Sequence, residues 1–111
     1  MARDNDDAVQ LLKGIGELYR RNGQFQRALV MLLIAVSVAP EDGVLLRSLV
    51  LAFTDSGDAT RALGALDRLV ALEGESASLL LLRARALWYG ERKDEARQCF
   101  KRYLAARRAG A

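Results

Sequence analysis

Apolar residues along this chain recur every three or four positions, a spacing typical of α-helices, whereas apolar and polar residues alternate in β-strands. Breaks that contain glycine, proline or serine separate six such stretches. The pattern predicts one helix from residue 8 to a turn at Asn22-Gly23. It predicts five more at about residues 24–38, 44–55, 59–72, 77–89 and 93–107.

Polar residues precede the first of these helices. Asp4–Asp7 supply side-chain oxygens that can accept from the free N–H groups of a first helical turn. Their negative charge also suits the N-terminal end of the helix dipole. We therefore expect this segment to cap the first helix.

An internal repeat with a period of 34 residues is the strongest pattern in the sequence. The turn glycines Gly23 and Gly57 keep this period, whereas Gly90 comes one residue early. Agreement at so many positions predicts three copies of one helical hairpin. Three further sets of residues have the same spacing: Ala28, Ala62 and Ala96; Tyr19, Phe53 and Leu87; Leu32, Leu66 and Phe100.

The marker residues of the first unit resemble the tetratricopeptide repeat. Gly16, Tyr19, Ala28 and Pro40 follow its order on a 34-residue period, and Leu32 stands where an aromatic residue is usual. The resemblance implies an all-α, right-handed solenoid of three helical hairpins in one domain. Its segments are an N-terminal cap segment (1–8), three repeats (9–42, 43–76 and 77–108) and a tail (109–111).

The sequence offers little for catalysis or for binding metal. It contains no histidine, which excludes imidazole acid–base chemistry and imidazole metal sites. The single cysteine, Cys99, can form neither an intramolecular disulfide nor a zinc ligand set, and we expect it to pack in a helix. We therefore expect a protein that is not an enzyme, with no catalytic residues, no metal ligands and no cofactor.

Charge and hydropathy favour a soluble protein of a reducing compartment. The first ten residues are acidic and polar, unlike a signal peptide, and the longest apolar run, Ala28–Ala39, is too short to span a bilayer. Residues 91–108 hold seven Lys and Arg against three Asp and Glu, so the last helix is either a solvated surface or a docking site for an acidic partner. Nucleic-acid binding is disfavoured, because no aromatic stacking platform is interleaved with these charges.

The first helix of each repeat would line a concave groove, the usual binding surface of a solenoid. Helical spacing predicts charged groove residues in the first repeat and apolar or aromatic ones in the third. Trp88 and Tyr89 are residue types that anchor interfaces, although Trp88 could instead pack over its own turn. Tyr103 replaces a small residue of the first repeat, so its ring must fold back or meet a partner. The nine predicted partner-binding residues are Lys13, Val44, Arg47, Leu51, Leu81, Arg85, Trp88, Tyr89 and Tyr103.

More of the chain is apolar than six small amphipathic helices can bury. Leu79–Leu82 is a run of four leucines, and a helix cannot direct all four into one core. Val30, Leu33 and Ile34 are expected on the outer face of the second helix. Such residues imply a partner or self-association, unless neighbouring helices bury them.

Two stretches resemble the type III secretion chaperones of the SctY (YscY) type. One comprises Gly14, Leu18, Gly23, Arg27-Ala28, Leu32-Leu33 and Pro40-Glu41, and the other is Leu81–Leu104, with Gly90, Asp94–Arg97 and Tyr103-Leu104. The resemblance implies a bacterial cytoplasmic chaperone that binds a small secreted export component of the SctX type. The pair would then engage the cytoplasmic domain of the export-gate protein, and either a homodimer or a heterotetramer is compatible with this.

Two alternatives stay open at this point. A three-repeat chaperone for translocator proteins would serve a different client in the same secretion system. A stand-alone tetratricopeptide scaffold would instead associate with itself through the exposed leucines, and it would be soluble without a client.

Overall fold

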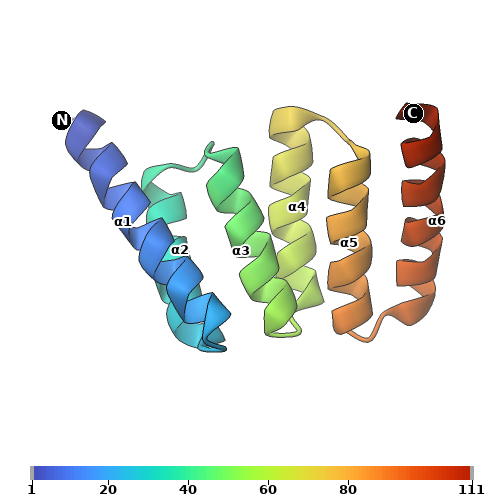
Figure 1. The fold of residues 1–111 in the computed structure, drawn as a ribbon, viewed down its shortest axis with the longest axis horizontal. Helices are drawn as coiled ribbons and strands as arrows, with labels where there is room; N and C mark the ends of the chain where they lie inside the picture. The colour runs from blue at the N-terminus through green and yellow to red at the C-terminus, as the bar shows by residue number, and fades with distance from the viewer. Residues whose placement is uncertain (1, 111) are drawn as a thin grey trace.

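The computed structural model describes residues 2–110, and these residues form helices and turns only. The predicted all-α architecture of six helices in three consecutive hairpins is confirmed (Figure 1). The helices are α1 (Ala2–Arg21), α2 (Phe25–Val38), α3 (Gly43–Asp55), α4 (Ala59–Glu73), α5 (Ala77–Tyr89) and α6 (Lys93–Gly110).

The hairpins α1–α2, α3–α4 and α5–α6 follow one another along the longest axis, so α1 and α6 lie at opposite ends (Figure 1). The molecule is elongated, with principal extents of 44 × 27 × 20 Å. The first helices of the hairpins form one row, because α3 packs against both α1 and α5. Each hairpin also packs against the next, through contacts of α2 with α3 and of α4 with α5. This row presents the surface on which the sequence places the groove.

The two helices of each hairpin are joined by the same turn, a Schellman motif. In the first hairpin the N–H of Gln24 donates to the carbonyl of Tyr19 (2.9 Å), and the N–H of Gly23 donates to that of Arg20 (3.1 Å). The same pair of hydrogen bonds recurs 34 and 68 residues later. Positive φ angles fall at Gly23 (75°), Gly57 (77°) and Glu91 (65°). The third turn therefore keeps the 34-residue register although its glycine does not.

Close contact between α1 and α2 depends on small residues, as the sequence predicts. Ala28 is fully buried, and a β-carbon built on Gly16 would lie only 2.9 Å from the Leu32 side chain. Leu69 stands where the first hairpin has the small Ala35, and it too is fully buried. The larger side chain is thus accommodated within the core of the second hairpin.

Two clusters of buried residues stabilise the fold. The larger one extends from α1 to α5 and joins the first two hairpins to the start of the third. The smaller one lies within the third hairpin and consists of Leu80, Ala84, Leu87, Ala96 and Cys99. Only Ala96 and Cys99 of α6 are buried, so α6 is the least covered of the second helices.

The ends of the chain differ from the prediction. Helix α1 already begins at Ala2, so Asp4–Asp7 lie inside it and do not cap it; that expectation is wrong. Residues 2–8 thus continue into the first repeat as one helix. At the other end α6 extends to Gly110, beyond the predicted end near residue 107.

Candidate protein-binding site

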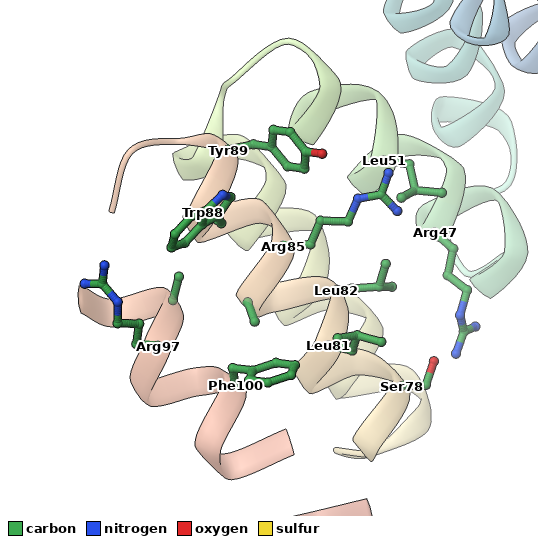
Figure 2. A pocket seen from close by; sticks show the side chains of 12 residues that line it. Arg47, Leu51, Ser78, Leu81, Leu82, Arg85, Trp88, Tyr89, Arg97 and Phe100 are labelled. Atoms are coloured by element: carbon green, nitrogen blue, oxygen red, sulfur yellow. The ribbon is translucent and has the colours of Figure 1, made fainter. Parts of the chain in front are cut away.

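A pocket of about 650 Å³ crosses α5 and reaches α3 on one side and α6 on the other. Figure 2 shows its side chains converging from these three helices. Most of its surface is apolar. The residues that line it are Arg47, Leu51, Ser78, Leu81, Leu82, Ala84, Arg85, Trp88, Tyr89, Ala96, Arg97 and Phe100.

Six of the nine predicted partner-binding residues line this pocket: Arg47, Leu51, Leu81, Arg85, Trp88 and Tyr89. The structure brings them together because α3 and α5 lie side by side in the row of first helices. Lys13, Val44 and Tyr103 are not among its lining residues. Lys13 lies on α1, one hairpin away, and Val44 is an exposed residue in the first turn of α3.

Three arginines and no carboxylate line the pocket. Arg47 forms a bidentate ion pair with Glu73 (2.8 and 2.9 Å), and Arg97 pairs with Asp94 (3.0 Å). Arg85 lies 5.9 Å above the ring of Tyr89 and forms no ion pair with the carboxylates of the described residues. The pocket therefore suits an apolar ligand segment that also carries negative charge.

Trp88 remains 45% exposed, although two cations lie over its ring. Lys93 Nζ is 4.8 Å from the ring centroid and the Arg97 guanidinium carbon is 5.8 Å away, both from α6. These contacts orient the indole beside α6, so Trp88 does not simply pack over its own turn. Much of its apolar surface is available to a partner.

Tyr103 folds back onto the protein. It is half-buried against the smaller core cluster, and its ring centroid lies 5.5 Å from that of Phe100. Its placement as a partner-binding residue lies outside the pocket, and the second of its two expected roles, packing, is the one that the structure shows. Thr54, also predicted to face the groove, is buried, and its hydroxyl donates to the carbonyl of Val50 (2.8 Å).

The predicted charged end of the groove is largely occupied by its own ion pairs. Arg20 contacts Glu17 and Asp55, each at 3.1 Å, and so joins α1 to α3. Although partial burial acts against the charge, these carboxylates raise the pKa of Arg20 above its ordinary value. This end therefore has less free charge to offer a ligand than the sequence suggests.

Sequence reasoning did not assign the α6 residues of the pocket. Phe100 has the same position in its hairpin as Leu32 and Leu66, which are completely buried, so the repeat pattern predicts a core residue. In the structure Phe100 is 44% exposed. The missing signal was that, within the described residues, no further helix follows α6 to cover it.

The expected excess of exposed apolar residues is present. Val30, Leu33 and Ile34 on α2 are about half exposed, as predicted for its outer face. Of the four consecutive leucines, Leu79 and Leu80 are buried, whereas Leu81 is 41% exposed and faces the pocket. One helix therefore does not bury all four.

The remaining chemistry supports packing roles. The Cys99 thiol is buried and donates to the carbonyl of Leu80 (3.3 Å), and burial raises its pKa. Within the described residues no cluster of His, Cys, Asp or Glu could hold a metal ion. None of the helices within residues 2–110 combines the length and apolar character needed to cross a membrane. In the comparisons, no protein-family model matches the sequence, and no curated protein matches it.

Proposed function

We propose that this protein is a small chaperone that binds one client protein through the pocket between α3, α5 and α6. The observation that carries this proposal is an apolar pocket lined by three arginines and no acid. A pocket of that composition suits an apolar segment with acidic residues, such as a stretch of an unfolded or partly folded protein. Arg85, without an ion-pair partner, is the residue best placed to meet a client carboxylate.

The resemblance to the SctY (YscY) type supplies the biological role in this proposal. The protein would hold a secreted component of the SctX type in the bacterial cytoplasm and help deliver it to the export gate. Exposed apolar side chains support a role with an obligate partner, because soluble monomers rarely leave contiguous apolar surface uncovered. Leu81, Trp88 and Tyr89 would supply the apolar anchors.

Co-expression with an SctX-type protein, followed by affinity capture and light scattering, tests the proposal. We expect recovery of a complex of fixed stoichiometry. Leu81→Ala and Arg85→Glu should each weaken it at least about tenfold, the loss typical of a central interface residue. Val44→Ala is the matched control, because Val44 is exposed on α3 but outside the pocket. Equal binding by the pocket variants and the control would contradict the pocket as the client site.

A further inference from the structure

The repeat register relates the two ends of the molecule to contacts inside it. Residues that face the following hairpin should recur 34 residues apart, and in the third hairpin they should face the next unit in line. At the α6 end these are Trp88 and Phe100, which occupy the positions of Thr54 and Leu66. Thr54 and Leu66 are 1% and 0% exposed, whereas Trp88 and Phe100 are 45% and 44% exposed. We call these two residues, with the neighbouring Ala84 and Arg97, the end face.

The opposite end shows the complementary pattern. Leu11 and Leu18 on α1 are 64% and 60% exposed, the two most exposed large apolar residues of the described part of the chain. The residues 34 and 68 positions after them are all buried. For Leu11 they are Leu45 and Leu79, and for Leu18 they are Ala52 and Ala86.

We call Leu11, Gly14 and Leu18 the start face. Gly14 lies between the two leucines, and a β-carbon built on it would have no neighbour within 4 Å. By register, the start face is the surface with which a first helix packs against a preceding hairpin. On α1, no preceding hairpin within the described residues covers it.

We propose that two copies of this chain associate head to tail, with the start face of one copy packed on the end face of another. Helix α1 of the second copy would take the position against α5 and α6 that α5 takes against α3 and α4. The leucines of the start face would cover Trp88 and Phe100. This interaction does not rest on the proposed client.

Charge complementarity favours a second copy as the occupant. In the fold, the end of α4 lies next in sequence to the start of α5, four residues away. In the proposed pair, the end of α6, which carries Arg107 and Arg108, would therefore lie beside the start of α1. That start carries exposed Asp4, Asp6 and Asp7. Opposite charges would thus meet at the same edge of the interface, and added salt should weaken it.

Head-to-tail contact is heterologous, so it leaves one free face at each end of a pair and permits further addition. Light scattering of the wild-type chain from micromolar to millimolar concentration should therefore show a mass that rises with concentration and falls with added salt. Leu18→Glu blocks the start face, and Phe100→Glu blocks the end face. Each variant alone should remain at 12.2 kDa. Both residues are exposed, and circular dichroism would verify that each variant keeps its helices.

Mixing the two variants gives the decisive result. Leu18→Glu retains an intact end face and Phe100→Glu retains an intact start face, so the mixture should form one-to-one pairs of twice the single-chain mass and nothing larger. Leu33→Glu, on the outer face of α2, is the matched control and should associate like the wild type. A wild type that stays monomeric at millimolar concentration would overturn the proposal and leave the end face to a different protein. A mixture that stays monomeric, or association lost in Leu33→Glu alone, would also overturn it.

Discussion

Replacing Glu91 with glycine should stabilise this protein, although glycine is normally unfavourable. Glu91 has a φ of 65°, the only positive φ at a residue other than glycine within the described chain. In the other two hairpins the same turn position holds Gly23 and Gly57. The β-carbon of Glu91 therefore meets the local crowding that glycine avoids in the left-handed region.

The expected gain follows from opposing contributions. Holding a residue with a β-carbon in the left-handed conformation costs about 1–2 kcal/mol. Glycine returns about 0.4–1 kcal/mol of this through the greater freedom of the unfolded chain. The Glu91 carboxylate lies 3.6 Å from Lys93 Nζ but is 80% exposed, so its loss contributes little. The net gain in the free energy of unfolding should be about 0.5–1 kcal/mol, which raises the Tm by about 2–5 °C for a domain of this size.

Urea unfolding followed by circular dichroism measures this difference, with Glu91→Ala as the matched control. The alanine variant loses the same carboxylate but keeps a β-carbon, so it should remain close to the wild type. Gly57→Ala is the reciprocal change and should destabilise, since its added β-carbon meets only one atom, at 3.9 Å, and the cost is conformational. If Glu91→Gly proved no more stable than Glu91→Ala, the conformational argument would be refuted.

Three other predictions concern packing and pH. Gly90→Ala should destabilise in the same urea assay, because its β-carbon would overlap that of Ala59 on α4. Leu66→Ala should lower the free energy of unfolding by about 2–5 kcal/mol, the usual cost of a cavity at a fully buried leucine. Phe100→Ala at the equivalent position of the third hairpin should cost less, because 44% of Phe100 is already exposed. Finally, burial raises the pKa of Cys99 above its ordinary value of 9.0. The thiol's contribution to stability is therefore complete below that value and is lost as pH rises through the higher folded-state pKa. Unfolding midpoints measured across that alkaline range should fall less steeply for Cys99→Ala than for the wild type.

The interior of the fold could be predicted from the sequence because local and repeated signals agree there. The predicted bounds of α5 match the structure, and those of α2 differ by one residue at its start. The start of α1 could not be placed, because Asp4–Asp7 suit the first turns of a helix as well as its cap. Helical spacing also does not show that Thr54 is covered by the adjoining hairpin.

Half of the pocket residues followed from the same reasoning, and the other half show its limit. Arg47, Leu51 and Arg85 could be assigned from the face of α3 or α5 on which they lie. Phe100 and Arg97 belong to a second helix, which the groove argument does not consider. Their exposure depends on whether another helix follows, and a repeat pattern alone carries no information about its own boundary.

The side chain at one repeated position indicates that the α6 end is adapted to be covered. This position holds Arg20 in the first hairpin, Thr54 in the second and Trp88 in the third. Arg20 pairs with Asp55 of the following hairpin, and the Thr54 hydroxyl is satisfied within its own helix beneath that hairpin's neighbour. Water alone at the end of the solenoid would favour a polar residue at this position, since exposed indole surface remains in contact with water at a cost. A tryptophan beside an exposed phenylalanine instead has the composition of an interface core. A second copy and a client segment both supply an apolar cover, and the mixing experiment distinguishes them.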